Sequence, residues 1–326
     1  MNQNFIDFME KYAGQKIAIA ISGGVDSVAL LYWMREIGVD IVALHVNHGL
    51  RDVADVEAEY VHDLCKKLKI PCEILCWDGE KPVTGLESAA RDARYKLMTD
   101  YCANNGIEYL AVAHQADDQI ETFLMNLSRG SGLYGLSAMR GESERDGVKI
   151  IRPLLNVFRA ELEKYCADNN IKYYIDEMND DEKYTRVRIR KNRHLMYDKL
   201  GISDERILLA IKNLSRTRDA MDEYIADRIK LVRKKDYARF KASFLFDEPM
   251  DIRLRLIGTL ITEIGGNPYG PRLNSLENAL DSLGDNSKLT LGHCILRRLG
   301  DDILIVPTGS SASFRKRKEI INENAK

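Results

Sequence analysis

The chain has 326 residues, of which 45% are hydrophobic and 30% are charged, and its formal net charge at pH 7 is −2. These values are typical of a globular protein with a sizeable core. No stretch approaches the roughly 18 apolar residues of a membrane span, and residues 1–16 lack a signal-peptide pattern, so we expect a cytoplasmic protein that does not enter a membrane.

The six cysteines are scattered along the chain, and none forms a C-x-x-C pair. This spacing excludes a zinc ribbon and a redox dithiol, and it favours buried free thiols. The cysteines are Cys65, Cys72, Cys76, Cys102, Cys166 and Cys294.

The first half of the chain alternates strand and helix patterns. Strands are predicted at 17–21, 41–46, 72–77 and 109–113, and helices at 26–37, 53–69, 87–105 and 115–128. This alternation predicts an α/β fold with a doubly wound, mainly parallel sheet. In such sheets, ligands bind outside the carboxyl ends of the strands.

The second half is less regular. A polar break lies at 141–147, Pro153 ends a strand in KIIRPLL, and a helix follows at 157–170. Residues 173–196 indicate a strand, an acidic loop and the start of a basic helix. A long polar helix is predicted at 221–241, and two helices, a turn and a hairpin within 249–307. We therefore expect a catalytic domain at 1–200, a helical linker at 201–245 and a small α+β domain at 246–326.

Charge is distributed unevenly, since residues 1–200 sum to −6 and residues 201–326 to +4. Basic residues gather at 183–199, 230–241 and 314–319. A single charge run is usually a solvated face, but three in a slightly acidic chain indicate a nucleic-acid partner.

The segment SGGVDS at 22–27 joins the first strand to the next helix. Its glycine pair lets an anion approach the N–H groups of the helix N-terminus, whose dipole adds about 0.3–1 kcal/mol per contact. Ser22 and Ser27 add hydroxyl donors, and Asp26 offers a carboxylate for a metal ion. The alternative is a tight turn with a serine cap.

The segment HQADDQIET at 114–122 places His114, Asp117, Asp118 and Glu121 at i, i+3, i+4 and i+7, a spacing that predicts one shared helix face. Clustered acids repel one another unless a cation offsets them. A metal or an ammonium group would do so, and zinc is disfavoured with a single histidine. A solvated first helical turn is the alternative, because acids are also favoured there.

Two further segments end near the same sheet edge. HVNHGLR supplies His45 and His48, and ESAARDARY supplies Arg91 and Arg94, whose guanidinium groups suit phosphate or form an ordinary surface pair. GSGLYG at 130–135 fits the dinucleotide fingerprint, but it follows a helix instead of a strand, and no Walker-type loop is present.

Six segments of the chain occur in the order SGGVDS, HVNHGLR, ESAARDARY, HQADDQIETFLMNLSRGSGLYGL, IRPLL and RVRIR. Together they carry a resemblance of the chain to the tRNA(Ile)-lysidine synthetase family of the ATP pyrophosphatase (PP-loop) superfamily. The resemblance spans about residues 16–193, with a fainter part over 250–307. It implies an adenine nucleotide α-hydrolase-like fold. It also implies adenylation of the wobble cytidine of a CAU-anticodon tRNA(Ile) at O2, followed by displacement of AMP by free L-lysine.

The resemblance also implies residue roles. ATP and Mg²⁺ would bind the loop of Ser22, Gly23, Gly24, Val25, Asp26 and Ser27, with Asp26 toward the metal and Arg94 toward the nucleotide. Asp118 and Glu121 would recognise lysine, and Arg186 would assist catalysis. The basic residues beyond 183, which include Arg188, Arg190 and Arg193, would bind tRNA, and so would the small domain at 246–326. The resemblance leaves open whether the chain forms a homodimer.

Val187 departs from the family pattern, which usually has Asn there, and we expect the chain to lack the further C-terminal domain of longer members. The lysine ammonium has a reference pKa of about 10.4, so Asp118, Glu121, His114 or a substrate group must accept its proton. The alternatives are a tRNA thiolase, an ammonia-using amide synthetase and a non-catalytic RNA-binding protein.

Overall fold

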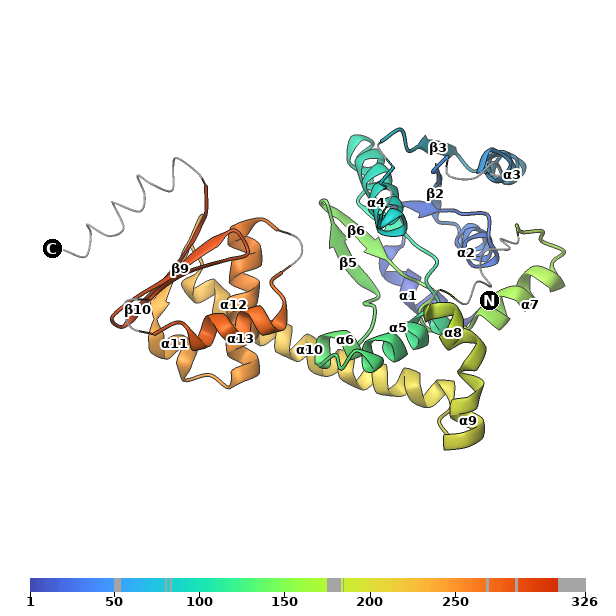
Figure 1. Cartoon of the computed structure of the whole chain (residues 1–326). Coiled ribbons are helices and arrows are strands. Elements are labelled where there is room, and N and C mark those ends of the chain that lie inside the picture. Colours follow the sequence, from blue (N-terminus) through green and yellow to red (C-terminus); the bar gives the residue numbers. More distant parts are fainter. Residues whose placement is uncertain are drawn as a thin grey trace. The chain divides into compact units, whose positions relative to one another are not determined.

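The computed structural model describes residues 1–49, 54–79, 81–82, 84–174, 183, 185–267, 270–284 and 287–309 (Figure 1). The chain divides into two compact units, Met1–Arg216 and Thr217–Lys326. The division lies within helix α10 (Asp204–Val232), inside the segment predicted as a helical linker.

The first unit is built on a six-stranded sheet with the order β3-β2-β1-β4-β6-β5. All neighbouring strands are parallel except β5, which runs antiparallel to β6. The predicted doubly wound, mainly parallel α/β fold is therefore confirmed. The strands are β1 (Lys16–Ala20), β2 (Asp40–Asn47), β3 (Cys72–Cys76), β4 (Tyr109–Ala111), β5 (Glu142–Arg145) and β6 (Val148–Ile151).

Helices cover both faces of this sheet (Figure 1). Because side chains alternate along a strand, Ile17 and Ile19 of β1 pack with α1, α2, α3 and α7, whereas Ala18 packs with α4 on the other face. The helices of this unit are α1 (Gln3–Met9), a 3₁₀ turn (Glu10–Tyr12), α2 (Val25–Glu36), α3 (Ala54–Leu68), α4 (Leu86–Asn104), α5 (Ala116–Ser128), α6 (Leu133–Leu136), α7 (Arg159–Asp168), α8 (Thr185–Asn192), α9 (His194–Leu200) and the first part of α10.

From β1, strands β2 and β3 follow toward one edge of the sheet, whereas β4 and β6 follow toward the other edge. Such a topological switch point, here between β1 and β4, leaves a crevice at the carboxyl ends of the two strands, because their connections leave toward opposite sides of the sheet. The segments that follow β1 and β4 are the glycine turn at 22–24 and the start of α5. The fold therefore brings two of the predicted motifs to one edge.

The second unit is a four-stranded antiparallel sheet, β7-β10-β9-β8, packed against helices. Alternate residues such as Ala238, Phe240 and Leu296 face a core shared with α12. Its elements are β7 (Ala238–Lys241), α11 (Ala242–Phe246), α12 (Met250–Gly265), α13 (Leu273–Asp281), β8 (Lys288–Leu291), β9 (Cys294–Leu299) and β10 (Asp302–Pro307).

Three local predictions need correction. The helix predicted at 221–241 ends at Val232, and 238–241 form β7, where basic residues alternate with buried Ala238 and Phe240. The hairpin predicted near the C-terminus is a meander of three strands. The polar break predicted at 141–147 contains β5, and Asp146 and Gly147, both at positive φ, form the turn between β5 and β6. An Asp-Gly pair favours a hairpin turn, but the polar composition of the segment led to the prediction of a break.

The strand predicted near residue 173 is not found at Tyr173 and Tyr174, and its continuation lies outside the described residues. Among the helices that the structure describes, none has the length and apolar character needed to cross a bilayer.

The end of α12 provides a test of packing in the second unit. A Cβ at Gly265 would overlap the backbone carbonyl oxygen of Gly292, whereas a Cβ at Gly284 would meet nothing within 4 Å. We expect Gly265→Ala to lower the free energy of unfolding by about 1–3 kcal/mol, as overpacking does. Denaturant unfolding checks this, with Gly284→Ala as control. Equal stability of the two variants would contradict the packing described.

Candidate active site

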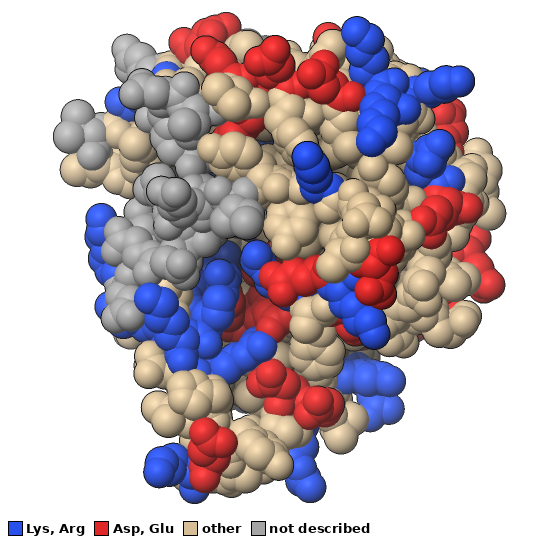
Figure 2. Space-filling model, turned by 90° about the vertical axis from the view of Figure 1, so that its right-hand side faces the viewer, with Lys and Arg blue, Asp and Glu red and all other residues tan. Residues whose placement is uncertain are grey.

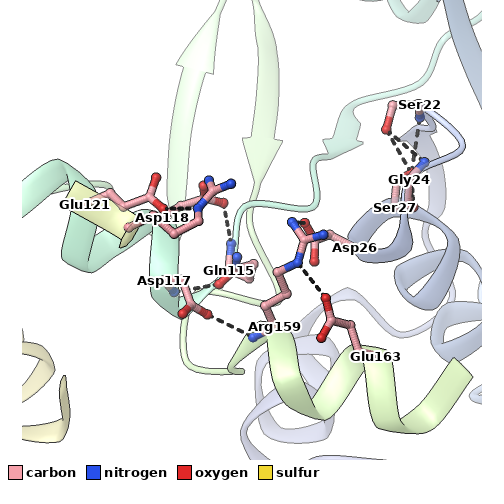
Figure 3. A network of polar contacts seen from close by, with 11 residues as sticks. Ser22, Gly24, Asp26, Ser27, Gln115, Asp117, Asp118, Glu121, Arg159 and Glu163 are labelled. Carbon is pink, nitrogen blue, oxygen red and sulfur yellow. Dashed lines mark hydrogen bonds and ion pairs between the residues drawn. The ribbon is translucent and has the colours of Figure 1, made fainter. Parts of the chain in front are cut away.

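The glycine turn after β1 is held by its two serines (Figure 3). The Ser27 hydroxyl donates to the Gly24 carbonyl (3.0 Å) and accepts from the Ser22 N–H (3.2 Å). Ser27 is buried and maintains the turn, whereas Ser22 is exposed. Gly24 is the N-cap of α2 and provides no side-chain cap, so the N–H groups of the first turn face outward for an anion.

Gly23 has a structural reason to be glycine. Its φ is +88°, a conformation that other residues rarely adopt, and a Cβ there would lie 3.4 Å from the Tyr60 ring and 3.5 Å from Val61. The side of Gly23 on which a Cβ would stand is therefore in van der Waals contact with α3.

Asp26 lies in the first turn of α2, after Val25, with a quarter of its side chain exposed. Burial raises the pKa of Asp26 to about 6; Arg159, 3.8 Å away, opposes this rise, and Asp118 and Asp117 add to it. Its Oδ1 atom is buried without a hydrogen-bond partner among the described residues. A carboxylate oxygen left in this way fits a bound cation.

The start of α5 separates the acids that the sequence pattern placed together. The helix begins at Ala116, so His114 lies before it in the loop after β4. Asp117 accepts a hydrogen bond from the Arg159 N–H (2.9 Å) and pairs with Arg193. Asp118 turns back to accept from the Gln115 N–H (3.1 Å), as in a capping box. The prediction of one shared helix face for all four residues is wrong, because His114 precedes the helix and the carboxylates of Asp117 and Asp118 bind different partners.

Asp118 and Glu121 form the acidic part of the site (Figure 3). Glu121 is fully buried, and its Oε1 atom accepts from Arg190 at 2.8 Å, while Oε2 has no hydrogen-bond partner in the described part of the chain. Asp118 forms no ion pair with any described residue. Burial raises the pKa of the Asp118 carboxyl, with Glu121 adding to the rise and the Gln115 N–H, Arg186 and Arg190 opposing it.

His114 has four arginine side chains in its surroundings. Burial, and after it the positive charges of Arg152, Arg91, Arg186 and Arg94, together lower the pKa of His114 to about 3. Its Nδ1 atom is buried and has no partner within the described residues. An imidazole ring with this pKa is neutral at pH 7 and is a poor proton acceptor. This disfavours His114 among the groups that the sequence offers as acceptors of the amine proton.

The predicted arginines take different places. Arg94 of α4 donates to His48 Nε2 at 3.3 Å. Arg186, Arg188 and Arg190 lie on α8, where Val187 is buried and Arg188 is exposed. Arg190 pairs with Glu121, and Arg193 pairs with Asp117 and with Asp204 at 3.4 Å. Figure 2 shows basic side chains bordering a group of acidic ones on one face of the molecule.

Sequence reasoning missed Arg159 and Gln115. Arg159 is the first residue of α7 and reaches both Asp26 and Glu163, the latter at 2.8 Å. His45 is buried, and its Nδ1 atom bonds to the Ile21 carbonyl (2.9 Å), which ties β2 to the glycine turn. Only the Q-x-x-D capping pattern at 115–118 could have been found in advance.

Comparison with known proteins adds a family. Residues 1–195 match the PP-loop domain family. The tRNA(Ile)-lysidine synthase of Wolbachia pipientis wMel is 38% identical over 321 residues, which cover 94% of this chain and 74% of that protein. The chain belongs to the tRNA(Ile)-lysidine synthase family. The member from Rhodopseudomonas palustris (strain ATCC BAA-98 / CGA009) is 33% identical over 324 residues, 92% of each chain.

Among solved structures, the U34-tRNA thiolase NcsA from Methanococcus maripaludis with its [4Fe-4S] cluster matches with a TM-score of 0.54 at 18% identity. The match covers 66% of this chain and 77% of that one. At this identity it supports the fold alone. Membership of the tRNA(Ile)-lysidine synthase family, in contrast, rests on sequence identity across both units.

The low pKa of His114 leads to a prediction for acid stability. The folded protein keeps His114 neutral, whereas in the unfolded chain it binds a proton below about pH 6.5, so its contribution to stability is lost as the pH falls from 6.5 toward 3. We expect the parent chain to lose about 2 kcal/mol more unfolding free energy between pH 7 and pH 5 than His114→Gln. Urea unfolding at both pH values checks this, and equal losses would refute it.

Proposed function

We propose that this chain converts the wobble cytidine of a CAU-anticodon tRNA(Ile) to lysidine, with ATP and free L-lysine as co-substrates and AMP and pyrophosphate as products. In this reaction AMP is transferred to O2 of cytidine, and the amine then forms a C–N bond at C2 as AMP leaves with that oxygen. The observation that carries the proposal is the position of the glycine turn beside an acidic pair that has an unpartnered carboxylate oxygen.

ATP use follows from membership of the PP-loop family. We propose that the N–H groups of Gly23 and Gly24, with the Ser22 hydroxyl, hold its phosphates and that Arg94 contacts the nucleotide. Asp26 fits a Mg²⁺ ion, because its Oδ1 atom lacks a partner among the described residues. Mg²⁺ needs only one or two carboxylates besides substrate phosphates, and when bound it offsets the charge that develops on the α-phosphate.

For the amine of lysine we propose Asp118 and Glu121. Arg190 offsets the charge of Glu121 and Arg193 that of Asp117, so one carboxylate, that of Asp118, lacks an arginine partner among the described residues. The negative charge of a partly buried carboxylate without an ion-pair partner favours binding of a cation. The ammonium would satisfy both Asp118 and the unpartnered Oε2 atom of Glu121.

The amine must lose a proton before it attacks. A pKa near 3 disfavours His114 as acceptor. Burial raises the pKa of Asp118, which brings its basicity closer to that of the amine and makes it the better candidate. We propose Asp118 as the proton acceptor, and Arg186 as the cation that stabilises the charge of the departing AMP.

The tRNA would lie along the basic residues beyond 183. Arg188 is exposed on α8 and suits a backbone phosphate. Arg190 and Arg193, whose guanidinium groups also serve Glu121 and Asp117, would border the RNA. We further propose a cytoplasmic location, where tRNA is modified.

A thiolase function is less well supported. The cysteines are all described and free, and four of them are buried. Among the described residues, no three His, Cys, Asp or Glu side chains gather to hold a metal. An iron–sulfur cluster would need several thiolates at one place.

The reaction itself can be observed directly. The purified protein is incubated with ATP, L-lysine and a CAU-anticodon tRNA(Ile) transcript. We expect it to convert the wobble cytidine to a nucleoside whose mass is higher by that of one lysine less one water. Mass spectrometry of the digested tRNA checks this. Omission of lysine is the control, and an unmodified cytidine under complete conditions would refute the proposal.

The acidic pair can be tested by removing one charge. We expect Asp118→Asn to raise the KM for lysine at least about tenfold, because a paired charge contributes about 1.4 kcal/mol or more there, and to leave the affinity for ATP within about twofold. Steady-state kinetics and nucleotide titration measure the two effects. Asp168→Asn, at an exposed position of α7, is the control. Equal losses for lysine and ATP would contradict the assignment.

A further inference from the structure

A group of cationic side chains surrounds His114 at the carboxyl edge of the sheet. Arg91 and Arg94 come from α4, Arg152 follows β6 directly, and Arg186 comes from α8. All four lie near enough to His114 to lower its pKa. Three elements far apart in the sequence therefore bring positive charge to one place.

Three of these four arginines have no acidic partner among the described residues. None of Arg91, Arg94 and Arg152 forms an ion pair with a described acid. Arg145, which lies over the same Tyr95 ring as Arg91, is by contrast paired with Asp92 at 2.8 Å. The mutual repulsion of neighbouring like charges costs free energy unless an anion lies among them.

Two buried nitrogen atoms in this group also lack partners among the described residues, namely Nδ1 of His114 and Nε of Arg152. The other end of Arg152 is engaged, because its Nη1 atom donates to the Arg140 carbonyl (3.0 Å) and to the Ser143 hydroxyl (2.9 Å). Arg152 is therefore held in place while its Nε–H stays unused. A fixed guanidinium with a free donor is suited to a phosphate oxygen.

We propose that Arg91 and Arg152 bind a backbone phosphodiester of the tRNA next to the modified nucleotide; this rests on the function proposed above. The glycine turn already provides an anion site for the triphosphate at the end of β1. Arg91 lies on α4, which packs on the opposite face of the sheet from α2, and Arg152 lies on the far side of β4 from β1. The two anion sites thus lie on either side of the switch point.

Arg91 is the better position for a test. Its described contact is with the Tyr95 ring, at 5.5 Å, whereas loss of Arg152 would also remove two structural hydrogen bonds. We compare Arg91→Gln, Arg91→Lys and the parent chain. Lys96→Gln, which removes an exposed positive charge from the same helix, is the control.

Binding of the CAU-anticodon tRNA(Ile) transcript is measured by fluorescence anisotropy over a series of salt concentrations. For Arg91→Gln we expect a three- to tenfold weaker affinity and a slope of log K against log salt that is smaller by about 0.7, as for one lost phosphate contact to single-stranded RNA. Arg91→Lys should restore most of the slope, and Lys96→Gln should leave it unchanged. Thermal unfolding verifies that each variant is folded.

An unchanged slope for Arg91→Gln would overturn the inference. So would a loss of affinity for a non-hydrolysable ATP analogue with tRNA binding intact, because the phosphate would then belong to the nucleotide. The lysidine assay on the parent chain separates the two claims. If the parent chain makes no lysidine, the proposed function fails, whereas the slope still decides whether Arg91 contacts RNA phosphate.

Discussion

The site depends on an unequal pairing of charges at the start of α5. Three carboxylates there, Asp117, Asp118 and Glu121, face two arginines that form ion pairs with them, Arg190 and Arg193. Asp118 has only the Gln115 N–H as a hydrogen-bond partner among the described residues. Because burial makes an uncompensated charge costly, this arrangement favours a cationic ligand. The amine of the proposed lysine substrate would meet that requirement.

Topology explains why this charge matters for a nucleotide reaction. β1 and β4 are neighbours at the point where the strand order reverses, so the glycine turn and α5 rise from the same edge. Arg159 of α7 links the two, since it pairs with Asp26 and donates its N–H to Asp117. The group around His114 adds positive charge on the side of α4. The edge is therefore divided into an acidic region, which we propose for an amine, and a basic region, which we propose for phosphate.

Much of this could be predicted from the sequence, and the exceptions have physical causes. Alternating strands and helices predicted the sheet, and SGGVDS predicted a turn at the N-terminus of a helix. The pairing of Glu121 with Arg190 could not be predicted, because 69 residues separate them and no local pattern specifies which arginine of RVRIRKNR reaches α5. Helical spacing misled at His114, since the helix begins at Ala116 and Gln115 caps it. In β7, basic residues concealed the alternation that the partner strand β10 makes evident.

The central claim is that Asp118 and Glu121 receive an amine beside the nucleotide site. The most direct measurement is a crystal structure of the protein with L-lysine and a non-hydrolysable ATP analogue. The account predicts an amine nitrogen of lysine at about 3 Å from a carboxylate oxygen of Asp118 and from Oε2 of Glu121, on the same edge as the triphosphate. Lysine bound elsewhere, with Asp118 still facing only Gln115, would contradict it.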